Sequence, residues 1–152
     1  MKTAYFSLGC FWSPQLEFEK IKGVKRAEAG YCGGDDASTN YEKVCSGSTN
    51  HAETVKVEFD DSVVSYEELV RTFFKIHDPT QLNRQGPDIG TQYRSEIFYK
   101  DEGQKKVAEK IKIEFNEKFK GKIVTKISKE KLYQPAESYH QYYLKKKSII
   151  WI

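Results

Sequence analysis

The hydrophobic pattern of the chain alternates between strand-like and helix-like stretches. The clearest strand pattern covers residues 53–59, where apolar and polar side chains alternate. The clearest helix pattern covers residues 65–77, where apolar side chains recur every three or four positions and Ser65 with Glu68 forms a capping-box signature. Weaker patterns predict strands over 3–9, 24–30, 95–100 and 122–128, helices over 14–22, 102–119 and 137–146, and a short helical turn near 41–45.

This order of elements predicts an α+β fold. The series β-α-β-β-α-β-α-β is typical of a two-layer, mostly antiparallel, split βαβ (ferredoxin-like) sheet with helices packed on one face. The chain has no internal repeat and no linker-like segment. We therefore expect residues 1–152 to form a single catalytic domain, a length sufficient to bury a sizeable core.

Composition and charge exclude several classes of protein. Aromatic residues make up 14% of the chain, which argues against disorder. The second part, residues 101–152, has 13 basic residues against 7 acidic ones, but all 13 are lysines spread along amphipathic elements, so we expect no nucleic-acid partner. No apolar stretch approaches the roughly 18 residues of a membrane span. With too short an apolar run at residues 1–6 for a secretory signal, we expect a cytoplasmic monomer with no membrane partner.

The chain has three cysteines, Cys10, Cys32 and Cys45. An odd number does not suit a disulfide framework, and the absence of CxxC or CxxH pairs makes a zinc ribbon a poor fit. These features predict a reducing compartment, reactive thiols, no metal site and no bound cofactor.

Cys10 lies in Gly9-Cys10-Phe11-Trp12, between a predicted strand and a predicted helix. Ser13 is the expected N-cap of that helix, and Pro14 suits its first turn. A thiol at a helix N-terminus feels the positive end of the helix dipole, which predicts a lowered pKa and a reactive thiolate. On position alone, a buried inert cysteine beside two core aromatics is an equal alternative.

Three further segments are too polar or too rich in glycine to form part of the hydrophobic core. Cys32 lies among glycines in Gly30-Tyr31-Cys32-Gly33-Gly34, which predicts a mobile segment. Residues 41–53 combine a tyrosine, a cysteine, a histidine and a glutamate. Residues 78–94 form a polar stretch too long for a simple connection, and loops of that length are usually functional or disordered.

Taken together, these motifs resemble the A-type peptide methionine sulfoxide reductases. The resemblance is carried by Gly-Cys-Phe-Trp, Gly-Tyr-x-Gly-Gly, Cys-Ser-Gly-x-x-x-His-Ala-Glu and His-Asp-Pro-Thr-Gln followed by Gly-Pro-Asp-x-Gly-Thr-Gln-Tyr-Arg-Ser, in family order. It extends from about residue 3 to residue 145, including a last helix around Ser138-Tyr139-His140. It implies thiol-dependent reduction of methionine S-sulfoxide, free or in proteins, in a pathway of protein repair under oxidative stress.

The resemblance also implies roles for individual residues. Cys10 matches the nucleophile that becomes a sulfenic acid, and Glu53 matches the acid, whose pKa burial would raise. Tyr41 and Tyr93 match hydroxyl donors to the sulfoxide oxygen. The other matched positions bind substrate: Phe11 and Trp12 as walls of a methyl slot, and Asp88 as a second pocket carboxylate. The role of His140 stays open.

The chain departs from many family members because no cysteine follows Cys45. The sulfenic acid must therefore be resolved by Cys32, by Cys45 or by an outside thiol. We favour Cys32 because of its flanking glycines, which predicts that Cys32→Ser fails to turn over with thioredoxin. An intramolecular disulfide would be reduced by thioredoxin or another dithiol.

Three alternative functions remain at this stage. Cys10 could serve a thiol peroxidase acting on hydroperoxides, which would need no methyl slot. The aromatic pocket could bind methionine side chains without turnover. A metal site built from the three cysteines and a histidine has little support from their spacing.

Overall fold

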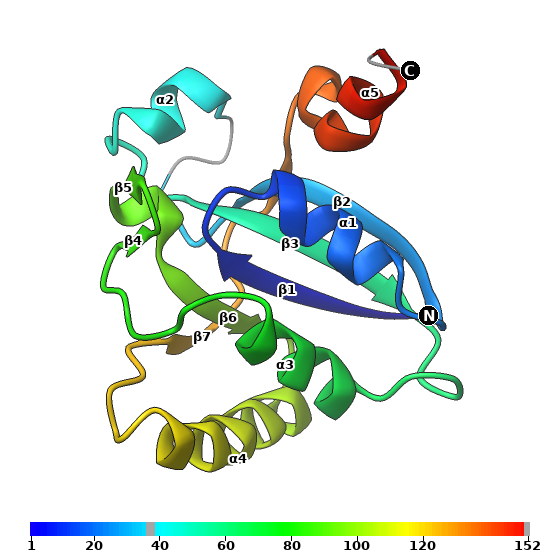
Figure 1. Ribbon diagram of the computed structural model, residues 1–152, viewed down its shortest axis with the longest axis vertical. Helices are drawn as coiled ribbons and strands as arrows, with labels where there is room; N and C mark the ends of the chain where they lie inside the picture. Colours follow the sequence, from blue (N-terminus) through cyan, green and yellow to red (C-terminus); the bar gives the residue numbers. More distant parts are fainter. Residues whose placement is uncertain (36–38, 151–152) are drawn as a thin grey trace.

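A six-stranded mixed sheet in the order β7-β6-β1-β3-β2-β8 forms the centre of the computed structural model, which describes residues 1–35 and 39–150 (Figure 1). Residues 36–38 and 151–152 of the predicted domain lie outside these ranges. The strands of the sheet are β1 (Lys2–Leu8), β2 (Val24–Cys32), β3 (Ala52–Phe59), β6 (Ser95–Tyr99), β7 (Lys126–Lys129) and β8 (Gln134–Pro135). A separate two-stranded ribbon pairs β4 (Arg84–Gln85) with β5 (Asp88–Ile89).

The four central strands, β6, β1, β3 and β2, pair antiparallel with one another. β1 and β2 both pair antiparallel with β3, which lies between them, so the unit β1–α1–β2 is a split βαβ crossover with α1 at Trp12–Glu19. β7 pairs parallel with β6 and makes the sheet mixed. The prediction of an α+β fold is confirmed. β7 begins later than the predicted strand over 122–128, because Val124 N donates to Pro79 O at 2.8 Å and so joins the neighbouring loop.

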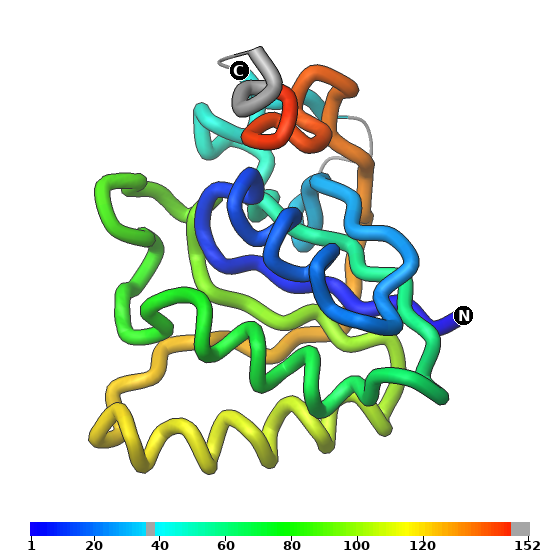
Figure 2. The backbone as a smooth tube through the Cα atoms, turned by 45° about the vertical axis from the view of Figure 1, so that its right-hand side comes forward, coloured from blue at the N-terminus to red at the C-terminus, as the bar shows by residue number. Residues whose placement is uncertain are grey.

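The long helices lie on one face of the sheet, as predicted. Phe6 of β1 stacks on Phe18 of α1 with ring centroids 4.9 Å apart and contacts Phe73 of α3 (Tyr66–Lys75) at 5.5 Å. α4 (Glu102–Lys118) runs alongside α3 (Figure 2). Phe74 of α3 stacks on Phe115 of α4 with ring centroids 5.3 Å apart. These aromatic contacts place the main hydrophobic core between the sheet and its helices.

Local capping signals account for the helix starts of α3 and α4. The Ser65 hydroxyl accepts a hydrogen bond from Glu68 N at 3.1 Å, and the Asp101 carboxylate accepts one from Gln104 N at 2.8 Å. Each side chain satisfies a backbone donor that the first helical turn leaves unpaired. The short helix α2 (Tyr41–Cys45) confirms the predicted turn and is capped in the same way by Asn40.

The single last helix predicted over 137–146 is wrong. The chain instead forms a 3₁₀ turn, η2 (Ser138–His140), and then α5 (Tyr143–Ile150). The Gln141 side chain bonds both backbone groups of Ala29, at 2.8 and 2.9 Å, and Tyr142 takes a positive φ of 53°. Anchoring to β2 therefore interrupts the helix at a contact that local periodicity cannot reveal.

Candidate active site

Cys10 lies in the tight connection between β1 and α1. Gly9 has φ of +99°, and a Cβ there would meet Gln85 Cβ of β4 at 2.8 Å, so only glycine fits this turn. The helix begins at Trp12 with Phe11 as N-cap, so the predicted N-cap Ser13 is wrong. The backbone of Phe11 can start the helix without a side-chain cap because its N–H already has a partner, the carboxyl group of Glu53.

Glu53 lies near the start of β3 on the helix-covered face and is only 1% exposed. Its Oε1 accepts a hydrogen bond from Phe11 N at 3.2 Å. Its Oε2 is buried and has no hydrogen-bond partner among the described residues. Burial raises the pKa of Glu53 to about 8, and hydrogen bonding from the Phe11 N–H and the Cys10 thiol acts in the opposite direction. At neutral pH the group is therefore mostly a carboxylic acid, as the sequence resemblance implied.

The thiol of Cys10 is not acidified, which corrects the prediction from the helix dipole. Burial and the charge of Glu53 raise its pKa to about 12, although the Trp12 N–H acts in the opposite direction. The helix N-terminus is present, but it is outweighed by the loss of water around the sulfur. Cys10 and Glu53 thus form a neutral thiol–acid pair at neutral pH.

Tyr41 and Cys45 stand on the short helix α2. A hydrogen bond to the Cys45 thiol raises the pKa of the Tyr41 hydroxyl, with burial adding to the effect. The charge of Cys45 also contributes to the raised pKa of Cys10, so the two sulfur atoms lie in the same electrostatic environment. Gln92 Nε2 donates to Cys45 O at 3.3 Å and ties the end of α2 to the next site segment.

The polar stretch 78–94 is an ordered loop that carries Asp88 and Tyr93. It contains the β4–β5 ribbon and a 3₁₀ turn, η1 (Thr91–Tyr93). Gln85 holds the loop closed by bonding both backbone groups of Asp78 at 2.9 Å. Burial and the charge of Glu53 raise the pKa of Tyr93, and Asp88 contributes to the raised pKa of Glu53. Glu53, Asp88 and Tyr93 therefore lie within electrostatic range of one another and of Cys10.

Phe11 and Trp12 contact a cluster of aromatic rings whose position the sequence did not predict. Phe11 is buried against Tyr31, whereas Trp12 is half-buried and stacks on Tyr143 with centroids 3.9 Å apart. Trp12 Nε1 donates to His140 Nδ1 at 3.1 Å. His140 is thus a member of the site, and its position in the Ser138-Tyr139-His140 motif was the signal available in the sequence.

Cys32 is not brought to this site. Tyr31 points to the helix-covered face and contacts Phe11, so the next residue of β2 points to the opposite face. Cys32 is fully buried there with Tyr5 and Phe98, and its thiol donates to Lys131 O at 3.3 Å. The glycines beside it do not free the segment, because β2 remains paired with β3 up to Cys32 opposite Ala52.

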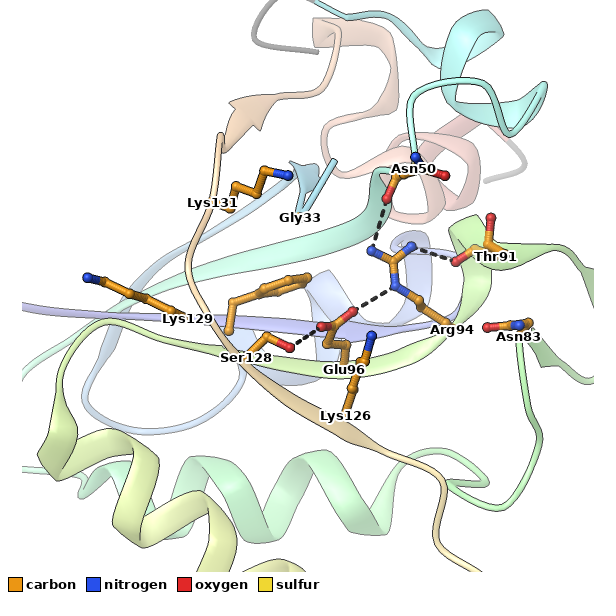
Figure 3. Close-up of a pocket in the computed structure, with 11 residues that line it drawn as sticks. Gly33, Asn50, Asn83, Thr91, Arg94, Glu96, Lys126, Ser128, Lys129 and Lys131 are labelled. Atoms are coloured by element: carbon orange, nitrogen blue, oxygen red, sulfur yellow. Dashed lines mark hydrogen bonds and ion pairs between the residues drawn. The ribbon is translucent and has the colours of Figure 1, made fainter. Parts of the chain in front are cut away.

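The opposite face carries a cavity of about 410 Å³ that none of the predicted site residues lines (Figure 3). Arg94 crosses its wall and donates to Glu96 Oε1 at 2.7 Å, Thr91 O at 2.9 Å and Asn50 O at 3.0 Å. Ser128 bonds the other oxygen of Glu96 at 2.6 Å. Arg94 therefore fastens η1 to the segment before β3 from behind the sheet.

The described ranges hold no helix long and apolar enough to span a bilayer. Within the same ranges, no group of three or more His, Cys, Asp or Glu side chains is placed to hold a metal ion.

Comparison with known proteins gives one family over almost the whole chain. The model of the family described as peptide methionine sulfoxide reductase matches residues 2–150. A Pelagibacter ubique protein named peptide methionine sulfoxide reductase MsrA is 54% identical over 147 residues, covering 97% of this chain and all of that protein.

Solved structures agree with this result. Mxr1 from Saccharomyces cerevisiae in its reduced form aligns with a TM-score of 0.93 and 38% identity, covering 97% of this chain and 86% of that one. Mxr1 in complex with Trx2 aligns with a TM-score of 0.68 and 26% identity, covering 93% of this chain and 84% of that one.

Proposed function

The chain belongs to the peptide methionine sulfoxide reductase family, and from that premise we propose that it reduces methionine S-sulfoxide, free or in proteins, with Cys10 as nucleophile and Glu53 as acid. This makes it an oxidoreductase that needs a thiol reductant and no bound cofactor. The names of its relatives supply the reaction. The assignment of residues and the preference for the S epimer are proposals.

One observation carries the assignment of the acid. Glu53 Oε2 is buried without a partner beside Cys10, and its pKa of about 8 keeps a proton on the carboxyl group at neutral pH. A buried polar atom without a partner is costly in a folded protein, and it suits an atom that finds its partner in the substrate. A sulfoxide oxygen is such a partner, because it accepts a hydrogen bond and becomes basic as the S–O bond weakens.

Cys10, Glu53 and the sulfoxide exchange all the protons and electrons of the first chemical step. The Cys10 sulfur attacks the sulfoxide sulfur while Glu53 donates its proton to the oxygen, and the thiol proton of Cys10 passes to Glu53. Oxygen then transfers as hydroxyl to the Cys10 sulfur and the substrate leaves as methionine. Cys10 is oxidised by two electrons to a sulfenic acid, the substrate is reduced by two electrons, and Glu53 is again protonated.

The remaining site residues serve orientation and charge stabilisation in this proposal. The Tyr41 and Tyr93 hydroxyls donate to the sulfoxide oxygen as negative charge develops on it. Trp12 and Phe11 form the apolar walls for the methyl group. Asp88 binds substrate from the β4–β5 ribbon.

For the second step we propose Cys45 as the resolving cysteine in preference to Cys32. The thiol of Cys45 attacks the Cys10 sulfenic acid, which forms a disulfide and releases water. Its charge acts on Cys10 and it lies on α2, whereas Cys32 would have to cross the sheet. A disulfide needs Cα atoms about 4.4–6.8 Å apart. In this proposal a small movement of α2 brings Cys45 within this distance of Cys10, whereas Cys32 would reach it only if β2 broke its pairing with β3.

The physiological reductant in this proposal is thioredoxin or another dithiol, which the relative solved with Trx2 supports. All three cysteines are free, which suits a reducing compartment such as the cytoplasm. A monomeric state remains a prediction, which size-exclusion chromatography with light scattering tests.

The test of function is reduction of racemic N-acetyl-methionine sulfoxide with dithiothreitol, followed by chiral chromatography. We expect loss of the S epimer alone, and no loss with Cys10→Ser. Consumption of hydroperoxide in preference to sulfoxide would instead identify a thiol peroxidase. Binding of sulfoxide without turnover would identify a binding module.

A further inference from the structure

The carboxylate of Glu137, which no sequence motif marked for chemistry, is bonded to three tyrosines around the site. Its Oε1 accepts from Tyr31 OH at 2.8 Å. Its Oε2 accepts from Tyr41 N at 3.0 Å and from Tyr139 OH at 3.1 Å. Burial opposes ionisation, but the bond from Tyr41 N and the other donors lower the pKa of Glu137, so the group is a carboxylate at neutral pH.

The bond to Tyr41 N lies at the start of α2. Tyr41 is the first residue of this five-residue helix, and its backbone N–H is among those that a first turn leaves unpaired. Asn40 already caps Lys43 N at 2.9 Å, so Glu137 supplies a second acceptor from a distant part of the chain. A helix this short has little stability of its own and depends on such contacts.

The same carboxylate reaches the wall of the site through Tyr31. The Tyr31 ring contacts Phe11 with centroids 5.8 Å apart, and Phe11 N is the donor to Glu53. Next to Glu137, the His140 ring lies 4.4 Å from the Tyr41 ring. Glu137 thus joins β2, η2 and α2 beside Tyr41, whose hydroxyl interacts with the charge of Glu53.

We propose that Glu137 is a positioning residue for the reductive step, which holds the Tyr41 hydroxyl over the Cys10–Glu53 pair by binding the backbone N–H of Tyr41. This inference rests on the proposed function and adds a residue to it. Glu137 does not touch the reacting atoms. Of its two routes to the site, the proposal assigns the effect on rate to the bond with Tyr41 N rather than to the contact of Tyr31 with Phe11. That assignment separates it from a general contribution to folding.

A double-mutant cycle tests the inference. The readout is methionine formed in a single turnover by reduced enzyme without added reductant, which leaves Cys45 out of the measurement. We expect Glu137→Ala to slow this step by on the order of 10-fold and Glu137→Gln by less, because the amide oxygen still accepts one bond. In the Tyr41→Phe background, which keeps the backbone N–H but lacks the hydroxyl, Glu137→Ala should change the rate by less than about 2-fold.

Equal slowing in both backgrounds, or no slowing in either, would overturn the inference. Glu130→Ala, which removes a carboxylate away from α2, is the matched control and should keep the wild-type rate. Glu137→Gln keeps the test open if Glu137→Ala fails to fold.

A second readout separates failure of this inference from failure of the proposed function. Hydrogen exchange of the Tyr41 amide reports the bond to Glu137 whether or not the protein reduces sulfoxide. We expect Glu137→Ala to raise its exchange rate by at least about 10-fold while amides of β3 stay protected. Unchanged exchange at Tyr41 would overturn the positioning role, and an inactive wild-type protein would overturn the proposed function alone.

Discussion

Cys10 and Cys32 lie on opposite faces of one sheet and differ in whether their polar neighbours are satisfied. Burial raises the pKa of both thiols, to about 12 and about 11, so acidity does not distinguish them. The Cys32 thiol donates to Lys131 O among aromatic rings. Cys10 faces Glu53, whose second oxygen has no partner in the described part of the chain. In the proposed mechanism, the reactive sulfur is therefore marked by an unsatisfied acid beside it rather than by a low thiol pKa.

Replacing each of these two cysteines by serine gives the largest expected difference in the single-turnover rate of methionine formation. Cys10→Ser should lower the single-turnover rate of methionine formation by on the order of a thousand-fold or more, because the soft nucleophile is lost. Cys32→Ser should keep that rate within about 2-fold, because its side chain cannot reach the site face. Rapid-quench chromatography of methionine measures both. A similar loss in the two variants would remove the distinction between the faces.

The next prediction concerns Glu53, the buried acid that donates the proton in the proposed mechanism. Glu53→Gln keeps the shape but has no acidic proton, so the same single-turnover rate should fall by about 10²- to 10⁴-fold. In the wild-type protein this rate should decline as pH rises through about 8, where Glu53 loses its proton. The matched control is Glu28→Gln on the opposite face, where Glu28 accepts a bond from Tyr133 at 2.7 Å. An active Glu53→Gln protein would assign the proton to another group.

Turnover with thioredoxin distinguishes Cys45 from Cys32 as the resolving cysteine. Cys45→Ser should lower steady-state turnover by about 10-fold or more while a first equivalent of methionine still forms, because the sulfenic acid then lacks its nearby thiol. Cys32→Ser should turn over at nearly the wild-type rate. The reverse pattern would restore Cys32, the residue favoured from the sequence, and would require β2 to open.

Glu53 also affects the free energy of unfolding. Glu53 holds its proton to about pH 8 in the folded protein, whereas an unfolded glutamate releases it near 4.5, so raising the pH between these values favours unfolding. Across this window the wild-type protein should lose up to about 3–5 kcal/mol relative to Glu53→Gln. Urea unfolding of both proteins at pH 5, 7 and 9 measures the difference. A difference independent of pH would show that burial does not raise this pKa.

Much of the framework could be predicted because its signals are local. Alternating side chains mark β3, and Ser65 caps α3 as expected. The end of β2 shows the limit of such signals. The predicted strand ended at Gly30, whereas pairing with β3 continues to Cys32. Because side chains alternate across a strand, these two additional residues place Cys32 on the opposite face from Cys10.

The sequence by itself determined the α+β class, the order of the main elements and the motifs that assemble around Cys10, because periodicity, caps and motif residues are written into neighbouring positions. Only the tertiary structure decided the protonation of Cys10, the burial that raises the pKa of Glu53, the separation of Cys32 from the site, and the contacts of His140 and Glu137. These properties depend on burial and on contacts between segments far apart in the chain. A pKa is set by the water and charges that surround a group in space, which no local pattern encodes.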